Sequence, residues 1–374
     1  MRDRLLPRVA IVAMALVFGV TYSLTAALLA IELARRGLDE SLIGANAAMH
    51  AVGVLAMAGL LPHLVAAVGV RKTVVGALAA AAVLMSAFPA LPCVWLWFLL
   101  RVLLGAASEI LFVLSETWLN ALTAEESRAR TMGAYTAALS MGFALGPLVL
   151  SQTGTEGFLP YAIGSGLALL AMVMIVVPRI AEPEIGKPTE ANPLRYLRLA
   201  PLAMGATALN AAVETAGLTF LALYAIDLGW EESRATQLMS CMMVGAICLQ
   251  IPIGWLGDRM DRRRLVIALA GLSAAAALAW PWALDHPTLI FALLFLWGGL
   301  FVGIYTIMLA IVGSRFSGSQ LVGIYAGMGV VWGAGALLGP AVAGLAMQAT
   351  PHGLVYLVAL ACGLFLAFAL VGRK

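Results

Sequence analysis

Charged residues are scarce in this chain: only 11% of its 374 residues are Asp, Glu, Lys or Arg, whereas 63% are hydrophobic. A soluble protein usually carries about 25% charged residues. The composition therefore excludes an ordinary soluble protein and predicts a polytopic membrane protein. The net charge of +3 comes from cations scattered between apolar runs, so we expect no nucleic-acid partner.

Cysteine and the usual catalytic motifs are also scarce. The four cysteines, Cys93, Cys241, Cys248 and Cys362, have no metal-binding or redox spacing, so we expect free thiols. The sequence contains no nucleotide-binding loop of the Gly-x-x-x-x-Gly-Lys-Ser/Thr type and no His-Glu-x-x-His motif, and nothing in it suggests a Ser-His-Asp cluster. We therefore expect no enzyme, no metal and no cofactor, and we expect an ion gradient as the energy source.

Long apolar runs dominate what is present. A bilayer core of about 30 Å is crossed by about 20 helical residues, and runs of that length occur twelve times. They lie at about 9–33, 42–66, 73–91, 94–119, 131–151, 157–178, 200–225, 235–256, 265–284, 288–312, 320–347 and 352–371. The predicted fold is all-α, with twelve transmembrane helices in two pseudo-symmetric six-helix bundles.

The stretch 179–199 is polar and contains three prolines, which predicts a cytoplasmic linker between an N-terminal bundle at 1–178 and a C-terminal bundle at 200–374. If the N-terminus is cytoplasmic, eighteen Lys and Arg residues fall on that side and only Arg35, Arg36 and Arg234 fall on the other. Because cytoplasmic loops carry the excess of positive charge, both termini are predicted to be cytoplasmic.

The two halves repeat short patterns at nearly one offset. GFALGP at 142–147 returns as GALLGP at 335–340 after 193 residues, and VRK at 70–72 returns as DRR at 261–263 after 191 residues. A duplicated chain predicts a solute cavity between the halves, near the middle of the membrane.

Three ionisable residues, Arg101, Glu109 and Glu116, interrupt the apolar run at 94–119. Spacings that are multiples of three to four place them on one side of a helix. A charge at the membrane centre costs about 2.5–3.5 kcal/mol, so this side should face a watery cavity or polar partners. We predict proton coupling at Glu109 with Arg101 as its modulator. Glu116 is predicted to form a cytoplasmic gate with Arg128 or Arg130.

Two other runs carry candidate polar residues. Thr207, Asn210 and Glu214 share one helical face, and His50 follows Asn46 by about one turn. Glu214 and His50 are further candidates for proton coupling, because a carboxyl or an imidazole can titrate when its surroundings change. Two alternatives remain open: Glu109 and Glu214 are permanently paired anchors, and His50 is hydrogen-bonded inside the bundle.

A solute cavity needs polar and aromatic lining. The residues predicted to line it are Asn46, Asn210, Thr207, Tyr22, Tyr305 and Trp332. Aromatic residues in membrane helices also serve as packing or interface residues, which is the alternative for the last three. The methionines at 239, 242 and 243 are predicted to be core.

The string GWLGDRMDRRR at 254–264 occupies a predicted cytoplasmic connection. Glycine permits close helix approach, a carboxylate accepts hydrogen bonds from a helix N-terminus, and arginine pairs with carboxylates or lipid phosphates. The predicted latch consists of Gly254, Asp258, Arg259, Arg262 and Arg263. The alternative is a basic loop that only sets the topology.

This string is similar to the signature loop of the major facilitator superfamily, Gly-x-Leu-Ala-Asp-Arg-x-Gly-Arg-Arg, and departs from it at Asp261. The loop at 62–72 resembles the first-half copy but has Ala66 and Ala67 in place of the usual Asp-Arg. Arg101 and Gly105 resemble an Arg-x-x-x-Gly element that is linked to coupling in proton-driven members. The whole chain resembles the YcaD-like branch of bacterial inner-membrane transporters.

Two stretches resemble the Gly-x-x-x-Gly-Pro element that is associated with antiporters. The first consists of Gly142, Gly146 and Pro147, and the second consists of Gly335, Gly339 and Pro340. From the residues alone, these elements predict either tight helix packing or a hinge.

The resemblance implies a secondary transporter of the bacterial inner membrane that works by alternating access, with proton-coupled export of a small organic or amphipathic solute. A proton-coupled uptake symporter or a facilitator is the alternative, and a non-transporting scaffold or sensor is a distant one. We expect a monomer whose partners are the solute, protons and lipids.

Overall fold

The computed structural model describes residues 2–123, 125–176, 198–316 and 318–371. Within these ranges, residues 2–8, 120, 125–133, 318–323 and 326 are described by backbone alone. Most of the described residues are helical and none of them forms a strand, and their contacts divide the chain into two compact units. The all-α prediction is confirmed.

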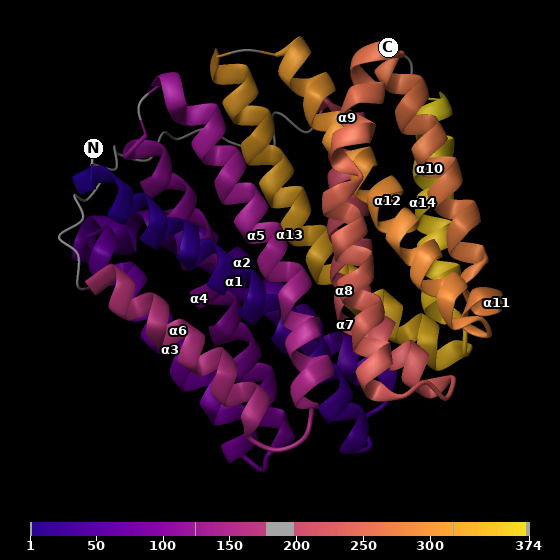
Figure 1. Ribbon diagram of the computed structural model, residues 1–374, viewed down its shortest axis with the longest axis horizontal. Coiled ribbons are helices and arrows are strands. Elements are labelled where there is room, and N and C mark those ends of the chain that lie inside the picture. Colours follow the sequence, from indigo (N-terminus) through magenta and orange to yellow (C-terminus); the bar gives the residue numbers. More distant parts are fainter. Residues whose placement is uncertain (1, 124, 177–197, 317, 372–374) are drawn as a thin grey trace. The chain divides into compact units, whose positions relative to one another are not determined.

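The first unit comprises Met1–Leu33 and Met49–Thr189. Its helices are α1 (Arg2–Arg35), α2 (Glu40–Val68), α3 (Val70–Ala90), α4 (Val94–Ala121), α5 (Glu125–Thr153) and α6 (Leu159–Val176). Helix α3 packs against both α4 and α6 (Figure 1).

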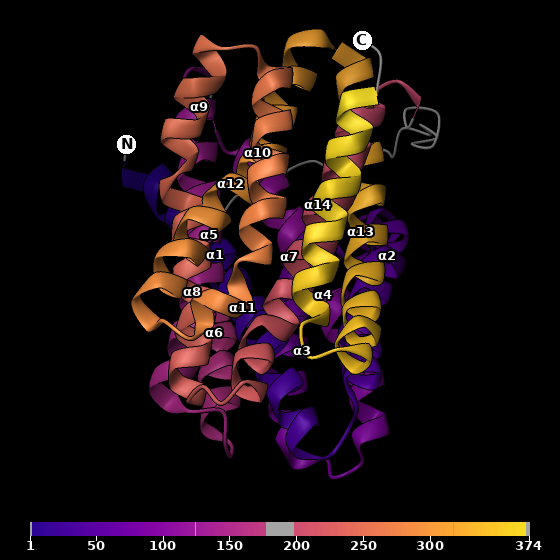
Figure 2. The same cartoon turned by 90° about the vertical axis from the view of Figure 1, so that its right-hand side faces the viewer.

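The second unit comprises Ala34–Ala48 and Glu190–Lys374. Its helices are α7 (Pro201–Asp227), α8 (Glu232–Cys248), α9 (Gln250–Arg259), α10 (Arg262–Leu278), α11 (Trp280–Leu284), α12 (Pro287–Arg315), α13 (Gly318–Ala349) and α14 (Gly353–Val371). Helix α7 packs on helix α13, and helix α12 packs on helix α8. Helices α10 and α14 lie side by side (Figure 2).

Eleven described helical segments are long and apolar enough to cross a membrane. Helices α8 and α9 together form one of them, with a change of helical hydrogen bonding at Leu249, three residues before Pro252. Helices α10 and α11 follow one another across Ala279 and occupy the predicted ninth span. The break precedes Pro281, which has no backbone N–H to donate to the helix. The twelve predicted spans are therefore present, two of them as broken helices.

Glycines bring α2 and α4 into backbone contact in the first unit. A Cβ added at Gly53 would lie 1.9 Å from the Val102 carbonyl oxygen, and one at Gly105 would lie 2.0 Å from the His50 carbonyl oxygen. No side chain other than hydrogen fits at either position, so the two helices cross at the closest distance that backbones allow.

The second unit repeats this crossing between α8 and α12. A Cβ at Gly245 would lie 1.9 Å from the Phe295 carbonyl oxygen, and one at Gly298 would lie 2.1 Å from the Met242 carbonyl oxygen. These four positions follow their first-unit counterparts by 192 or 193 residues. The offset predicted from short sequence matches is therefore also the offset of the closest helix contacts.

The Gly-x-x-x-Gly-Pro elements are packing surfaces in both units. In α5, a Cβ at Gly142 would lie 2.4 Å from the Leu16 carbonyl oxygen of α1. In α13, a Cβ at Gly339 would lie 2.1 Å from the Ala212 carbonyl oxygen of α7. Both helices continue through their prolines, Pro147 and Pro340. Tight packing is thus observed, and a hinge at these elements stays a prediction.

Trp97 and Trp118 lie 21 positions apart on α4, a spacing that matches the membrane core and predicts a tryptophan at each interface. The structure does not bear this out. Trp97 and Trp118 are fully buried in the first unit, and the Trp97 indole N–H donates to the Leu91 carbonyl at 3.2 Å. Trp95, two residues earlier, is 65% exposed and is the tryptophan available to a membrane interface. Spacing along one helix cannot reveal which neighbours cover a residue, and this explains the wrong prediction.

The short segment Ala34–Ala48 packs within the second unit. A Cβ at Gly44 would lie 2.3 Å from the Pro340 carbonyl oxygen, and one at Gly344 would lie 2.1 Å from the Glu40 carbonyl oxygen. Arg35 forms an ion pair with Glu232 at the start of α8. The predicted linker at 179–199 falls almost entirely outside the described residues, so the division into 1–178, 179–199 and 200–374 stays a prediction.

Candidate functional site

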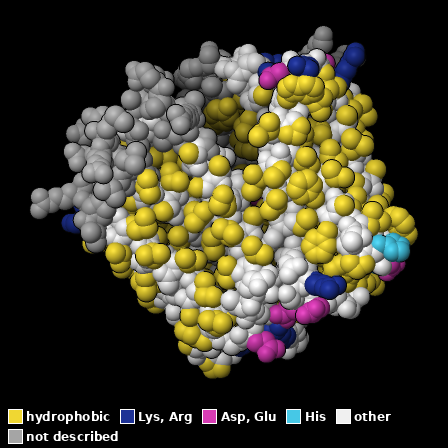
Figure 3. Space-filling view, in the orientation of Figure 1, with side chains coloured by type: hydrophobic (Ala, Val, Ile, Leu, Met, Phe, Trp, Pro, Cys, Tyr) yellow, Lys and Arg dark blue, Asp and Glu magenta, His cyan; other side chains and the backbone are white. Residues whose placement is uncertain are grey.

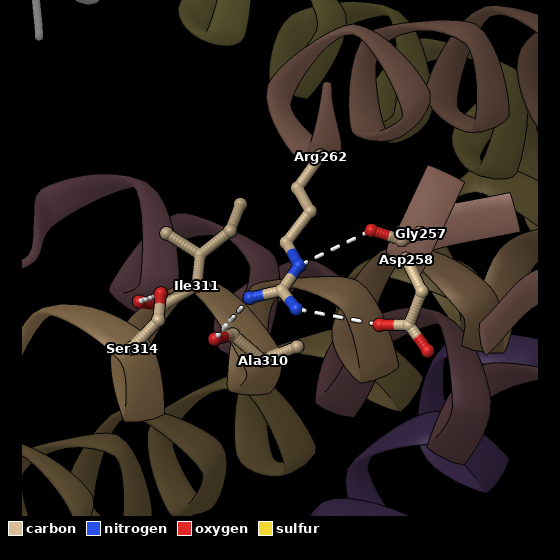
Figure 4. Close-up of polar contacts among 6 residues, drawn as sticks. All are labelled: Gly257, Asp258, Arg262, Ala310, Ile311 and Ser314. Atoms are coloured by element: carbon tan, nitrogen blue, oxygen red, sulfur yellow. Dashed lines mark hydrogen bonds and ion pairs between the residues drawn. The ribbon is translucent and has the colours of Figure 1, made fainter. Parts of the chain in front are cut away.

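The loop between α9 and α10 is held together by one guanidinium group (Figure 4). Arg262 donates to the Gly257 carbonyl at 3.2 Å and to the Ala310 carbonyl of α12 at 3.1 Å, and it pairs with Asp258 at 3.4 Å. Gly257 lies in the last turn of α9, where backbone oxygens lack intrahelical partners and attract cations, and Ala310 lies five residues before the end of α12. Arg262 therefore ties the ends of α9, α10 and α12 together.

The helix cap in this loop is Asp261, not Asp258. The Asp261 carboxylate accepts the Arg264 backbone N–H at 2.8 Å and begins α10, whereas Asp258 is exposed and contacts Arg262. Asp261 is the residue at which the loop departs from the superfamily pattern. An acidic residue at this position satisfies a free N–H of the first helical turn.

The other latch residues divide into two groups. Arg263 donates to the Ala369 carbonyl near the end of α14 at 2.9 Å, and Arg259 lies 3.8 Å from the Trp255 ring centroid. Gly257 approaches Ile307 of α12, whereas Gly254 has open space beside it, so the predicted close approach at Gly254 is wrong.

The first unit contains an equivalent of the Arg263 contact. Arg71, at the start of α3, donates to the Ile175 and Val176 carbonyls at the end of α6, at 2.9 and 2.6 Å. Arg263 follows Arg71 by 192 residues. Both units therefore use an arginine to bind carbonyls at the end of their last helix, even though the first-half loop lacks the Asp-Arg pair.

Arg101 is a buried cation in the first unit, 3% exposed. One of its terminal nitrogens donates to the Thr25 carbonyl of α1 at 3.3 Å, and its Nε has no hydrogen-bond partner among the residues that the structure describes. Within the same ranges Arg101 forms no ion pair with a carboxylate. Arg101 is therefore buried within the first unit, and Gly105, about one turn further along α4, lies against the backbone of α2.

His50, on α2, lies near Arg101 of α4 and is 5% exposed. Its ring packs edge-on against Tyr22, with centroids 4.8 Å apart, and Tyr22 in turn contacts Phe143. Neither ring nitrogen of His50 has a hydrogen-bond partner within the described part of the chain. The alternative in which His50 is hydrogen-bonded inside its bundle therefore has no support in the described residues.

The acids of α4 become more accessible toward its C-terminal end. Glu109 is half-buried and Glu116 is exposed. Neither forms an ion pair with a residue whose side chain is described. Arg128 and Arg130, the predicted partners of Glu116, lie outside the residues with described side chains, so the predicted gate stays a prediction.

The second unit holds its acid through a neighbouring amide. The Asn210 side chain donates to Glu214 at 2.9 Å, one turn away on α7, and the Asn210 oxygen has no partner among described residues. Thr207, on the same face, donates to the Ala203 carbonyl at 2.8 Å. The predicted shared face of these three residues is therefore present.

Comparison with known proteins identifies the family of the chain. The family model described as Major Facilitator Superfamily matches residues 10–236 and 202–374. The chain belongs to the major facilitator superfamily. Its members are transporters, so this protein is a membrane transporter and not an enzyme.

Relatives place the chain in the YcaD-like branch of the superfamily. It is 26% identical over 271 residues to the MFS-type transporter YcaD of Escherichia fergusonii, which covers 71% of this chain and 69% of YcaD. It is 30% identical over 190 residues to the MFS-type transporter YfkF of Bacillus subtilis (strain 168). That alignment covers 48% of each protein, about half the length of YfkF.

Solved structures share the fold at low sequence identity. A variant of the nucleoside transporter NupG aligns with a TM-score of 0.81 and 14% identity, over 98% of this chain and 100% of that chain. The D-xylose-proton symporter aligns with a TM-score of 0.80 and 14% identity, over 98% of this chain and 97% of that chain.

Asn46, another residue predicted to line the cavity, is 1% exposed, and its Nδ2 has no hydrogen-bond partner in the described ranges. Tyr305 and Trp332 are half-buried in the second unit. The three methionines of α8 are buried, as predicted. Of the cysteines, all free, only Cys362 is fully buried.

Two polar pairs were missed by sequence reasoning. Ser115 of α4 and Tyr135 of α5 share a hydrogen bond of 2.9 Å, and Thr306 of α12 donates to Gln250 of α9 at 2.6 Å. Each residue is a polar side chain in a mostly apolar segment, which is the available signal. The partner comes from a distant helix, so the sequence alone does not reveal the pairing.

Proposed function

We propose that this transporter is a proton-coupled secondary carrier that exports a small organic or amphipathic solute by alternating access. The main support is the set of buried polar nitrogens in α2 and α4. In the described part of the chain, Arg101 Nε, both ring nitrogens of His50 and Asn46 Nδ2 lack hydrogen-bond partners. Buried polar groups in proteins nearly always have a partner, either protein or water.

Water or a polar solute is the natural partner of these groups. A sealed apolar core leaves each such nitrogen with a desolvation cost of about 1–3 kcal/mol. An aqueous pathway that reaches them removes this cost. This favours a solute-conducting carrier over a membrane scaffold, because a scaffold gains nothing from unpaired polar groups at membrane depth.

Two carboxyl groups are proposed to carry the proton. Glu109 forms no ion pair with a described residue, and Glu214 is held by the neutral amide of Asn210. A carboxyl without a cationic partner can exchange a proton when its access to water changes. Arg101 on α4 is proposed to act as a modulator, and His50, which lies near enough for the charge of Arg101 to act on it, is proposed as an additional titrating group.

The placement in the cell is part of the proposal. The second unit carries the arginines of the α9–α10 loop at one end, and cytoplasmic ends retain positive charge. We therefore infer that both termini are cytoplasmic, in a bacterial inner membrane, and that the carrier acts as a monomer. Export is inferred from the Gly-x-x-x-Gly-Pro elements, and proton-coupled uptake remains the alternative direction.

Transport in everted membrane vesicles tests both the coupling and the direction. Solutes are first selected by their ability to raise the melting temperature of the purified protein. In vesicles with an imposed pH gradient, an exporter accumulates the selected solute inside, whereas an uptake symporter depletes it. Glu109→Gln and Glu214→Gln are expected to abolish proton-driven accumulation.

The matched control is Glu156→Gln, because Glu156 is an exposed carboxylate in the loop between α5 and α6. This variant is expected to transport normally. Unchanged proton-driven flux in both the Glu109 and the Glu214 variants contradicts the proposed coupling. If no solute raises the melting temperature and no flux is detected, the scaffold reading is favoured.

A further inference from the structure

A cavity of about 420 Å³ lies among the loops at one end of the second unit. Its lining includes two tryptophans, Trp230 and Trp282, a carboxylate, Asp285, and a histidine, His352. Leu228 and Leu284 add apolar surface. Small-molecule sites in proteins are typically about 300–1,000 Å³ and combine apolar walls with a few polar groups, so the size and the lining fit a ligand.

The loop after α7 fixes Trp230 in place. The backbone N–H of Trp230 donates to the Ala225 carbonyl at 3.0 Å, and the backbone N–H of Gly229 donates to the Ile226 carbonyl at 2.8 Å. This is the Schellman arrangement of a helix end. Gly229 has φ 91°, in the left-handed region that favours glycine. The Trp230 ring also packs against Phe291, with centroids 6.3 Å apart. The position of Trp230 is therefore set by its backbone hydrogen bond and by its contact with Phe291.

The second wall comes from the short helix α11. Trp282 is 63% exposed, and its ring meets the His286 ring edge-on with centroids 5.6 Å apart. Asp285 caps the C-terminus of α11 and is exposed. No cation among the described residues forms an ion pair with Asp285, so its charge is available to a ligand.

His352, between α13 and α14, completes the cavity. Its Nδ1 shares a hydrogen bond of 2.9 Å with the hydroxyl of Tyr224, which is 1% exposed in α7. His352 also contacts the Tyr356 ring. The histidine is thus anchored to the core of the unit while it faces the cavity.

The end of the second unit that holds this cavity is acidic. Its described helix ends and loops carry six carboxylates against three guanidinium groups: Asp39, Glu40, Asp227, Glu231, Glu232 and Asp285 against Arg35, Arg36 and Arg234. Acidic side chains gather near this end in the space-filling view (Figure 3). An excess of negative charge raises the local concentration of cations.

We propose that this cavity is a binding site for an amphipathic molecule that carries an ammonium group. The ammonium lies against Asp285 and the tryptophan faces, because a tryptophan ring attracts a cation over its face. The apolar part of the molecule contacts Leu228 and Leu284. The site consists of loop residues and the short helix α11 of the second unit, and it shares no residue with the proposed transport pathway.

Two sources supply this chemistry, a soluble organic amine and the headgroup of phosphatidylethanolamine. The test uses the full chain in neutral dodecyl maltoside micelles and measures benzyltrimethylammonium binding by isothermal titration calorimetry. One saturable site is expected. Asp285→Asn and Trp282→Leu are each expected to weaken binding about tenfold. Benzyl alcohol, which has the ring without the charge, is expected not to bind.

Matched controls come from the first unit. Trp95→Leu removes a tryptophan that is 65% exposed, close to the 63% of Trp282, and Glu156→Gln removes an exposed loop carboxylate. Both are expected to leave the affinity unchanged. All four substitutions change exposed side chains, so each variant is expected to fold. A melting temperature equal to that of the wild type checks this.

Added phosphatidylethanolamine distinguishes the two sources. If it raises the apparent dissociation constant in the wild type but not in Asp285→Asn, the headgroup occupies the same site. If it has no effect, a soluble amine is the ligand. The proposal is overturned if benzyltrimethylammonium does not bind the wild type, or if Asp285→Asn and Trp282→Leu bind it as tightly.

Discussion

Arg262 illustrates how much a single side chain does in this protein. Its guanidinium contacts two carbonyls and one carboxylate, from the ends of α9 and α12 (Figure 4). Only a planar group with several fixed donors can contact all three at once. The latch predicted from the sequence is therefore chiefly a network of hydrogen bonds from arginine side chains to backbone carbonyls near helix ends. Asp258 is its exposed acidic member.

Replacing Arg262 tests this network. Arg262→Lys keeps the charge but loses the fork of donors, so we expect a loss of about 1–3 kcal/mol in stability, seen as a lower melting temperature in detergent. Arg264→Gln is the control, because Arg264 is exposed and contributes only its backbone N–H to the Asp261 cap. Equal melting temperatures for the two variants would contradict the network.

Asp39 caps the start of α2 through its carboxylate. Its Oδ1 accepts the Ser41 hydroxyl at 2.7 Å and the Leu42 N–H at 2.8 Å, and these bonds hold the pKa of Asp39 below its usual value. A depressed pKa means that the ionised cap stabilises the folded state above the unfolded pKa, near 3.9, and that this stabilisation is lost as the pH falls through the folded pKa.

We expect Asp39→Ala to lower the melting temperature at pH 7. The difference from wild type should shrink as the pH falls below about 3.9, and it should level off below the folded pKa, where both proteins lack the ionised cap. Differential scanning fluorimetry across this range measures it. A difference that stays constant with pH would mean that the carboxylate charge does not support the cap.

At the scale of elements, the closest contacts are glycine crossings of helix pairs. Gly105 on α4 leaves no room for a methyl group beside the His50 carbonyl, and Gly298 on α12 leaves none beside the Met242 carbonyl. We expect Gly105→Ala and Gly298→Ala to destabilise the protein by about 1–3 kcal/mol each, since the backbones must separate. Thermal unfolding in detergent measures this.

Gly76 on α3 is the matched control, because a Cβ there meets no atom within 4 Å. Gly76→Ala is expected to be neutral or slightly stabilising, since alanine favours a helix over glycine. If Gly105→Ala melts at the same temperature as Gly76→Ala, the crossing is looser than the structure indicates.

For the whole molecule, the apolar runs predict the fold well and the details of each span poorly. Hydrophobic length alone locates the helices, because backbone groups in lipid must be satisfied within each helix. The breaks at Leu249 and Ala279 and the burial of Trp97 and Trp118 were not predicted. They depend on neighbours that pack against each helix, and hydropathy along one segment does not contain this information.

The candidate site shows the same limit. The burial of Arg101 follows from its position in an apolar run, but its acceptor, the Thr25 carbonyl, comes from another helix and is a backbone group. The Asn210–Glu214 contact was predictable because both residues lie on one helix, one turn apart. Within-helix spacing can be derived from a sequence, whereas the choice of partner between helices depends on packing.

The proposed orientation is tested with the natural thiols. Cys93 is exposed between α3 and α4, on the side predicted to be outside. In a variant that retains only this cysteine, a membrane-impermeant maleimide added to spheroplasts is expected to label it. Ser314→Cys in a cysteine-free background, near the predicted cytoplasmic end of α12, should react only after lysis. The reverse pattern would invert the topology.

The assignment of Ala34–Ala48 to the second unit has a consequence for dissecting the protein. A fragment that starts at residue 190 lacks these fifteen residues, whose backbone covers Pro340 and Gly344. Its α13 would expose a bare strip of backbone to detergent, and Glu232 would lose Arg35. Cutting the chain at its apparent midpoint therefore yields an incomplete piece, and the intact polypeptide is the smallest form worth purifying.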